Sequence, residues 1–319
     1  MSTAALLERY RPALTGHCYR MLGSVVDAED AVQEAMLRAW KGIDGLKEQS
    51  SLKTWLYRIA TNVCLSALSA NNQRRLRPLD LSDQPGVVSD DMALPQRPRE
   101  HWVEPIPDAM ALPAAEDCDP EERAILRESI RLAFVAALQY LPPRQRAVLL
   151  LTQVLNWSAA EAAESLGMTV AAVNGALQRA RATLEARNPA VVPRTLSEEQ
   201  SQLLAKYVEA FERYDVSALT KLLHDEVTMS MPPYELWLQG HDSIATWFLG
   251  HGIGCKGSRL VPVGACGGTP AFAQYRQGGA EPWALILLEL RDDRIASMTS
   301  FLDVEVLFPR FGLPMRLPS

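Results

Sequence analysis

The sequence contains no apolar run of the roughly 18 residues that a membrane-spanning helix needs. Its N-terminus also lacks the basic-then-apolar pattern of a secretory signal, so we expect a cytoplasmic protein without a membrane anchor. Cysteine is scarce, with five residues in 319, and no two of them form a C-x-x-C pair. An odd count without paired spacing predicts reduced thiols and argues against a disulfide framework or a zinc site. We therefore expect no bound metal and no cofactor.

The net charge of −6 argues at first against a nucleic-acid-binding protein, but the charge is unevenly distributed. Residues 1–78 contain 11 basic and 7 acidic residues, and residues 129–190 contain 6 and 3. The intervening residues 79–128 contain 4 basic and 13 acidic residues, and residues 191–319 contain 11 and 15. Two basic blocks separated by an acidic stretch are a reason to consider a nucleic-acid partner.

Composition and periodicity divide the chain into four parts. Apolar residues recur every three to four positions over residues 1–77, which predicts helices. Prolines are frequent from position 78 on, so residues 78–119 are predicted to be an acidic linker. Residues 120–188 are predicted to be helical again, and residues 198–319 begin with an amphipathic helix followed by strands. The expected fold is therefore multidomain, with two all-α domains and then an α+β domain.

One apolar island interrupts the linker. Trp102 and Ile106 alternate there with the acidic Glu104 and Asp108. Such residues in a polar linker suggest docking against a folded part of the chain, and an incidental apolar contact is the alternative.

Residues 158–184 carry the strongest local signal. A short helix is predicted from Ser158 to Leu166, ended by Gly167, and Thr169 is placed to cap a second helix. Val173 and Leu177 are expected to face inward. This spacing predicts a helix-turn-helix whose second helix enters the major groove of DNA, with an ordinary helical hairpin as the alternative. The outward side chains suited to base or phosphate contacts are Asn174, Gln178, Arg179 and Arg181.

Two patterns in the first 77 residues also suggest binding surfaces. Asp27, Asp30 and Glu34 recur at helical spacing, so three carboxylates share a helix face. Such a face binds a basic partner or is simply solvated. Farther along, the segment from Ser51 to Asn62 interleaves aromatic with basic and amide side chains, which can stack unpaired bases. Some of these aromatic and aliphatic residues are also expected in the core.

At this point the sequence resembles the extracytoplasmic-function group of the sigma-70 family of bacterial sigma factors. The segments DAEDAVQEAMLRAW and SLKTWLYRIATNVCLSAL resemble sigma region 2. The segment from LPPRQRAVLLL to QRARATL resembles sigma region 4. The resemblance implies a helical region 2 over residues 1–77 and a region 4 helix-turn-helix over residues 120–188. It also implies two partners, promoter DNA and core RNA polymerase, the latter through its beta-prime clamp and beta flap.

The resemblance implies three sets of functional residues. The set expected to bind core polymerase is Asp27, Asp30, Gln33 and Glu34. The set expected near the melted minus-ten element is Lys53, Trp55, Arg58, Asn62, Arg74 and Arg75, with Asn62 in a loop region that captures a flipped base. The set expected at the minus-thirty-five element is Thr169, Asn174, Gln178, Arg179 and Arg181.

Residues 198–319 resemble SnoaL-like domains, in which a curved sheet wraps helices around a pocket. The resemblance rests on the opening YVEAFERYDVSALTKLLHDEV and the closing ALILLELRDDRIASMTSFLD. Relatives of this fold include enzymes that use Asp/His pairs as well as non-enzymes, so the fold alone does not define an activity. A possible small-ligand pocket is expected at His224, Asp225, Trp237, His241 and Asp303.

The sequence is therefore interpreted as a sigma factor, without catalytic residues, that directs promoter-specific initiation and is regulated in cis by its C-terminal domain. Two alternatives stay open: a ligand-responsive helix-turn-helix regulator, and a DNA-binding module fused to a SnoaL-like enzyme. The acidic helix favours the sigma factor, because a repressor does not need a polymerase-binding surface. Whether the C-terminal domain inhibits or assists is also open at this level.

Overall fold

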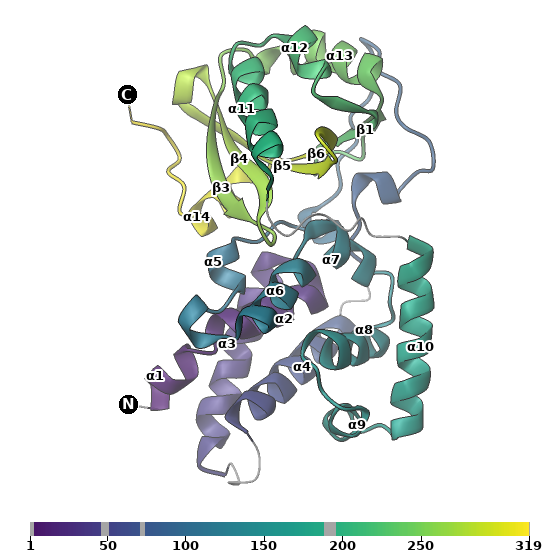
Figure 1. Cartoon of the computed structure of the whole chain (residues 1–319), viewed down its shortest axis with the longest axis vertical. Helices are drawn as coiled ribbons and strands as arrows, with labels where there is room; N and C mark the ends of the chain where they lie inside the picture. The colour runs from purple at the N-terminus through teal and green to yellow at the C-terminus, as the bar shows by residue number, and fades with distance from the viewer. Residues whose placement is uncertain (1–2, 46–50, 71–73, 188–195, 319) are drawn as a thin grey trace. The chain divides into compact units, whose positions relative to one another are not determined.

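The computed structural model describes residues 3–45, 51–70, 74–187 and 196–318, and it divides into two compact units (Figure 1). The first unit combines Met1–Arg75 with Val103–Ala190, and the second combines Leu76–Trp102 with Val191–Ser319. The expected linker 78–119 is thus split between the two units instead of forming one free tether. The expected boundaries at 188 and 198 flank residues 188–195, which lie outside the described residues.

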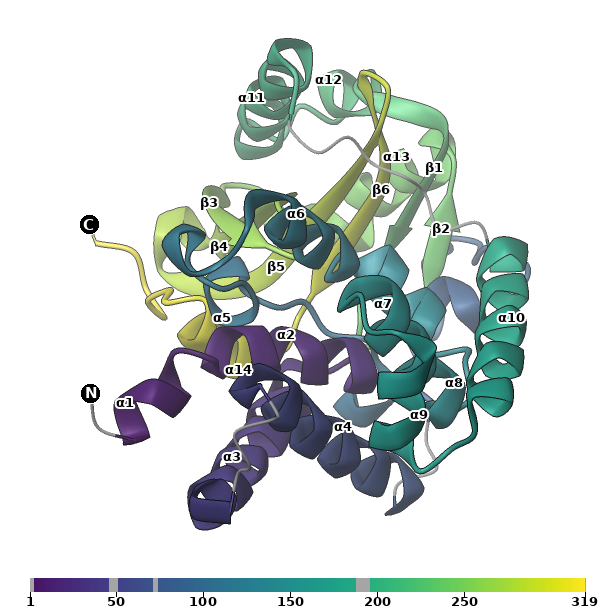
Figure 2. The same ribbon diagram turned by 60° about the horizontal axis from the view of Figure 1, so that its bottom comes forward.

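The first unit is all helical, as predicted. Its N-terminal half comprises α1 (Thr3–Glu8), α2 (Arg11–Leu22), α3 (Val25–Gly42) and α4 (Leu52–Ala70). Its C-terminal half comprises α5 (Asp108–Ala111), α6 (Pro120–Ser129), α7 (Leu132–Leu138), α8 (Pro143–Leu149), a π-helical turn η5 (Leu150–Val154), α9 (Ala159–Leu166) and α10 (Val170–Arg187). These helices can be followed in Figures 1 and 2.

Local capping explains where several of these helices begin. Ser24 accepts a hydrogen bond from the Asp27 backbone amide and starts α3. Asp119 accepts from the amides of Glu121 and Glu122, with Pro120 in the first position of α6. Pro143 likewise opens α8. These residues satisfy or remove amide donors that would otherwise lack a partner at a helix start.

Two buried arginines join the halves of the first unit. Arg146 of α8 donates to the backbone carbonyl of Met21 in α2 and to the side-chain oxygen of Gln139. Arg20 of α2 donates to the Ser129 hydroxyl at 3.0 Å. Both guanidinium groups are almost fully buried, and burial lowers the pKa of each to about 10. If the two halves separated, these buried hydrogen bonds would be broken and replaced by hydrogen bonds to water.

The second unit is a mixed helix-and-sheet domain that agrees with the α+β expectation. Its helices are α11 (Glu198–Glu212), α12 (Val216–Thr220), α13 (His241–Leu249) and α14 (Val304–Arg310). Its strands are β1 (Leu223–Ser230), β2 (Trp237–Gln239), β3 (Arg259–Ala265), β4 (Thr269–Arg276), β5 (Glu281–Arg291) and β6 (Arg294–Phe301). The sheet order is β2-β1-β6-β5-β4-β3, with β1 and β6 parallel and the other pairs antiparallel. A tight hairpin turn joins β5 to β6, with Arg291 opposite Arg294.

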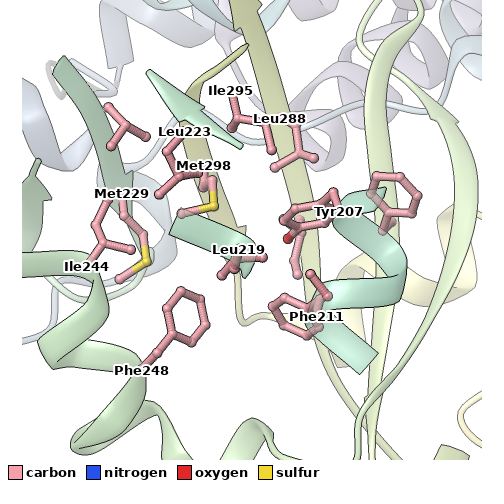
Figure 3. Packing of buried hydrophobic residues seen from close by; sticks show 14 of the residues in the cluster. Tyr207, Phe211, Leu219, Leu223, Met229, Ile244, Phe248, Leu288, Ile295 and Met298 are labelled. Carbon is pink, nitrogen blue, oxygen red and sulfur yellow. The ribbon is translucent and has the colours of Figure 1, made fainter. Parts of the chain in front are cut away.

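The core of the second unit lies between α11, α13 and the sheet (Figure 3). The rings of Tyr207 and Phe211 of α11 contact each other in a tilted arrangement at a centroid distance of 5.7 Å, and Phe211 meets Phe248 of α13 edge to face. Met298 and Leu288 come from the neighbouring strands β6 and β5. The amphipathic helix that the sequence predicted at the start of this domain is therefore α11, and its aromatic residues anchor it in the core.

Residues 76–102, which the sequence placed mostly in the linker, pack on this domain, and the two ends of this segment meet. The Gly86 amide donates to the Trp237 carbonyl at 2.8 Å, and the Arg97 amide donates to the Pro233 carbonyl at 3.0 Å. The partly buried Val88, Met92 and Leu94 pack against the domain core. At its two ends, the Leu76 amide donates to the His101 carbonyl at 2.7 Å, and Leu76 pairs with Trp102 in a parallel bridge. The segment therefore begins and ends at one place.

Candidate nucleic-acid and polymerase interface

The helix-turn-helix has the local geometry that the sequence predicted. Ser158 and Glu161 form a reciprocal capping box at the start of α9. Gly167 ends α9 with φ = 61°, a left-handed conformation that glycine adopts without strain. The Thr169 hydroxyl accepts from the Ala172 amide and so caps α10. The turn and both helix ends are thus determined by residues within the motif.

The second helix of the motif presents the expected polar face. Val173 is fully buried, while Asn174, Gln178 and Arg179 are exposed. Arg181 is also exposed, and its guanidinium donates to the Gln153 side chain at 2.6 Å. These side chains can therefore approach a DNA groove without unfolding the helix.

Sequence reasoning missed one feature of this face. Val170, in the first turn of α10, is 45% exposed. An exposed β-branched residue at the start of a groove-entering helix is suited to contact a thymine methyl group. The available signal was an apolar residue directly after the capping threonine.

The acidic face of α3 is largely exposed. Asp30, Gln33 and Glu34 are exposed, and Glu34 pairs with Arg38 one turn later at 2.7 Å. Asp27 differs, because its carboxylate binds the Arg75 guanidinium at 2.6 Å. Asp27 was expected to bind polymerase and Arg75 to contact DNA, yet in this structure the two engage each other.

Two large apolar side chains extend the same face of α3. Leu37 is 51% exposed and Trp40 is 56% exposed. They follow Asp30 and Glu34 at spacings of three to four residues, so all four lie along one side of the helix. Exposed apolar residues beside a polar rim mark a surface for a protein partner. The signal in the sequence that could have identified Leu37 and Trp40 is their helical spacing from Asp30 and Glu34.

The minus-ten candidates lie on α4 and just after it. Asn62 is exposed but stands in the middle of α4, so the expectation that it belongs to a loop is wrong. Trp55 is half-buried against Gly42 at the end of α3. Lys53 pairs with Glu122 of α6, and Arg58 pairs with Glu164 of α9 at 3.7 Å. Both basic side chains of α4 therefore contact acids from the C-terminal half of the unit.

The two arginines after α4 are engaged as well. The Arg74 guanidinium lies 3.5 Å from the centre of the Tyr140 ring, which is cation–π geometry. Arg75 is buried in its ion pair with Asp27. A direct phosphate contact by Arg75 would thus require this pair to open.

The linker island is divided between the two units. Trp102 belongs to the second unit, where its indole donates to the Arg97 carbonyl at 3.2 Å. Glu104 and Ile106 are buried in the first unit. The Glu104 carboxylate accepts from the Ser24 hydroxyl at 2.6 Å and from the Val25 amide at 3.1 Å, so it caps α3. Asp108 begins α5. The island is therefore not one docking patch, since a unit boundary follows Trp102.

Segment 103–112 approaches α2 very closely. A Cβ atom added at Gly16 would lie 2.3 Å from the Ala111 carbonyl oxygen. Only glycine permits this approach. The Tyr19 hydroxyl also donates to the Glu104 carbonyl at 2.6 Å.

The second unit contains a small cavity of about 30 Å³ with a mostly apolar wall. Three methionines, two tryptophans and three other aromatic residues dominate it, with polar groups from Cys255, Gln274 and Ser300. None of the five residues expected to form a pocket lines this cavity. Its full lining is Tyr207, Phe211, Met229, Met231, Trp247, Phe248, Cys255, Gln274, Trp283, Ile286, Met298, Ser300 and Leu302.

The five expected pocket residues have other contacts. A ring nitrogen of His241 lies 3.1 Å from the His224 carbonyl oxygen, and the His224 ring accepts from the Glu226 amide. Asp225 is exposed and Trp237 is buried in β2. Asp303 lies 3.8 Å from Arg99, and burial raises the pKa of its carboxyl. Three of the residues expected to form a pocket therefore contact neighbouring protein atoms: His224, His241 and Asp303.

Within the described ranges, no group of three or more histidine, cysteine, aspartate or glutamate side chains is arranged to hold a metal ion. The same part of the chain includes no helix that is long and apolar enough to span a membrane.

An exposed groove-entering helix, together with an acidic and apolar partner face in the same unit, defines a DNA-binding transcription protein. The family models agree: the model described as Sigma-70 region 2 matches residues 6–74, and Sigma-70, region 4 matches residues 131–184. The ECF RNA polymerase sigma factor SigG of Mycobacterium tuberculosis (strain ATCC 25618 / H37Rv) is 45% identical over 318 residues, which cover 98% of this chain and 84% of that protein. The chain belongs to the extracytoplasmic-function (ECF) sigma factor family.

A second relative has the same organisation. The ECF RNA polymerase sigma factor SigJ of the same organism is 26% identical over 307 residues, covering 91% of this chain and 88% of the relative. The crystal structure of Mycobacterium tuberculosis SigJ matches with a TM-score of 0.61 and 19% identity, and it covers 99% of this chain and 100% of that chain. The fold of two helical sigma regions followed by a helix-and-sheet domain is therefore confirmed.

Proposed function

We propose that this sigma factor binds core RNA polymerase through α3 and directs it to promoters read by α4 and α10. The exposed α3 face carries the polymerase-binding part of the proposal. Its carboxylates provide charge, and Leu37 and Trp40 provide the apolar anchors that dominate protein interfaces. A simple repressor would not need such a face.

Charge reversal on α3 tests polymerase binding. The Asp30→Lys and Glu34→Lys double variant, and separately Leu37→Ala with Trp40→Ala, should abolish binding to core polymerase in a pull-down assay. Exposed substitutions usually change stability by only about 0.5 kcal/mol, so the fold should persist. The exposed Asp83→Lys with Asp90→Lys is a charge-matched control that should keep binding. Undiminished binding by both α3 variants would refute this assignment.

We further propose that the C-terminal domain regulates the sigma regions by holding their connecting segment. A free chain from 76 to 119 could extend on the order of 140 Å. The contacts of the second unit remove much of that reach, because Leu76 and Trp102 are paired. Arg75 and Val103 consequently remain close in space as long as segment 76–102 stays packed on the domain. Opening of the first unit for promoter binding is thereby restrained.

The role of the C-terminal domain is proposed to be regulatory and non-catalytic. The His and Asp residues that would suggest acid–base chemistry do not line its cavity. Truncating the domain is a poor test, because it would also expose Val88, Met92 and Leu94, which pack on it.

Releasing the segment is a sharper test of regulation. Val88→Asp with Leu94→Asp should detach the segment and raise run-off transcription by reconstituted polymerase, because the two sigma regions can then separate. Val87→Asp is the matched control, since Val87 is 83% exposed. Equal transcription by the released variant and the control would contradict regulation through the tether, even if α3 proves to bind polymerase.

A further inference from the structure

The π-helical turn η5, which continues α8 towards the helix-turn-helix, carries an exposed glutamine, Gln153. The turn is closed by the Leu155 amide, which donates to the Leu150 carbonyl five residues earlier at 3.0 Å. Of the five residues in η5, four are buried and only Gln153 is exposed. Short π-helical turns are rare and often occur at functional sites. The buried neighbours therefore hold the backbone of Gln153 in place while its side chain stays accessible.

The Gln153 side chain meets the polar face of α10. The Arg181 guanidinium donates from Nη2 to the Gln153 Oε1 at 2.6 Å, although the two residues are 28 positions apart. Arg181 follows Asn174 and Gln178 at helical spacing, so these three side chains share one side of α10. The buried Ala180 directly precedes Arg181, and α8 packs against α10. The hydrogen-bond acceptor for Arg181 is thus placed by the core of the motif and comes from outside the second helix.

The neutral charge of Gln153 distinguishes this contact from those of the basic side chains on α4. There the Arg58 guanidinium pairs with the Glu164 carboxylate at 3.7 Å, which offsets its charge. The amide of Gln153 is uncharged, and Arg181 forms no ion pair with any residue that the structure describes. Because a guanidinium has five N–H donors, one bond to Gln153 leaves most of them available to an anion. Arg181 is therefore restrained without losing its positive charge.

We propose that Gln153 is a positioning residue for promoter recognition, which holds Arg181 in place to bind one phosphate of the DNA backbone. Guanidinium groups bind phosphate through paired hydrogen bonds, and a side chain that is already restrained loses less rotamer freedom on binding. Gln153 acts only through Arg181 and does not itself contact DNA. The inference rests on the proposed function, in which α10 reads promoter DNA.

The salt dependence of DNA binding tests this role, using the full chain reconstituted with core polymerase. The probe is a duplex fragment from which the native holoenzyme gives run-off transcription. Arg181→Ala should flatten the slope of log affinity against log salt concentration by about 0.9, the contribution of one phosphate. Gln153→Glu should flatten it similarly, because the new carboxylate pairs with Arg181 and competes with phosphate. Gln153→Ala should keep the slope and weaken binding about threefold, because Arg181 keeps its charge but loses its position.

Two further measurements separate positioning from a purely structural role. Gln202→Glu makes the same change of charge at an exposed position of α11, and it should leave affinity and slope unchanged. In thermal unfolding, Gln153→Glu should keep the native midpoint, since an ion pair replaces the hydrogen bond. A positioning role therefore predicts weaker DNA binding at native stability, whereas a purely structural bond predicts that Gln153→Glu keeps both.

Combining Gln153→Ala with Arg181→Ala completes the test. The second substitution should add no further loss, because a positioning residue acts only through the side chain that it holds. An added loss would overturn the role of Gln153, and so would native affinity and slope in both Gln153 variants beside a reduced slope in Arg181→Ala. If Arg181→Ala itself leaves affinity and slope unchanged, the proposed DNA-binding face of α10 fails, and this inference fails with it.

Discussion

The two helices of the first unit that are proposed to bind DNA, α10 and α4, differ in what their side chains contact. On α10, Asn174, Gln178 and Arg179 are exposed, and no side-chain partner for them is found in the described ranges. On α4, Lys53 and Arg58 pair with Glu122 and Glu164 of the other half of the unit. The polar face of α10, proposed to read DNA, is therefore exposed, whereas the basic side chains of α4, proposed to bind the minus-ten element, are paired with acids of the same chain.

This difference has a physical consequence for promoter binding. Exposed ion pairs are weak and salt-screened, so those of α4 exchange readily with phosphate. The buried Arg20 and Arg146 contacts beside them are harder to replace, because their partners would be left unsatisfied. The buried arginines, more than the surface pairs, therefore hold the two halves together.

The largest expected effect is a loss of stability of the first unit at acidic pH. His17 of α2 is fully buried beside Thr61 and Arg20, and desolvation followed by Arg20 lowers its pKa from 6.5 to about 3. Below pH 6.5 the His17 ring is protonated in the unfolded chain, whereas in the folded chain it stays neutral until the pH approaches about 3. Stability is therefore full above pH 6.5 and falls as the pH drops towards about 3, by up to about 1.4 kcal/mol per pH unit.

Hydrogen exchange over this pH range should show the His17 half losing protection first. His17→Gln should flatten the pH dependence relative to the native chain, and His251→Gln, in the second unit, should not. A pH profile unchanged by His17→Gln would show that this buried ring does not set acid stability.

The second prediction breaks the junction between the halves. Arg146→Ala should lower the free energy of unfolding of the first unit by roughly 3 kcal/mol, because a buried charged donor is lost and the Met21 carbonyl and Gln139 lose a partner. Denaturant unfolding measures it. Arg144→Ala, on the same helix but exposed, should have little effect. Similar midpoints for both variants would mean that the junction is weak.

The third prediction concerns the free face of α10. Arg179→Ala should weaken promoter binding by about 1–3 kcal/mol and relax specificity at one base pair if Arg179 makes a base contact. Arg181→Ala should mainly reduce the salt dependence of binding, if it contacts phosphate. Quantitative DNA binding at several salt concentrations distinguishes these results. If neither variant changes affinity or salt dependence, the register assigned to this helix is wrong.

The smallest effect on DNA binding is expected from removing the two ion pairs that Lys53 and Arg58 of α4 form. Glu122→Gln with Glu164→Gln should strengthen promoter DNA binding by about fivefold, since an exposed pair is typically worth about 0.5 kcal/mol and the two together about 1 kcal/mol. Asp83→Asn with Asp90→Asn changes the net charge equally and serves as the control. Equal gains in both variants would attribute the effect to overall charge and not to the pairs on α4.

Local sequence determined much of this protein. Capping by Ser158, Thr169 and Asp119, with the left-handed Gly167, defines helix ends through neighbours within a few residues. The same proximity explains why the recognition face, the acidic face and the β5–β6 hairpin were predictable: each follows a helical or strand period. The motifs of regions 2 and 4 are contiguous, which is why the family could be identified from them.

Tertiary structure alone decided the long-range relationships. Three contacts join residues that are far apart in the sequence. Asp27 pairs with Arg75, Glu104 caps α3, and Leu76 forms a β-bridge with Trp102. No periodicity encodes such contacts, because they depend on how the helices pack. For the same reason no periodicity indicated the lining of the second-unit cavity: a cavity is lined by whichever side chains converge in space, and here these come from α11, α13 and four strands.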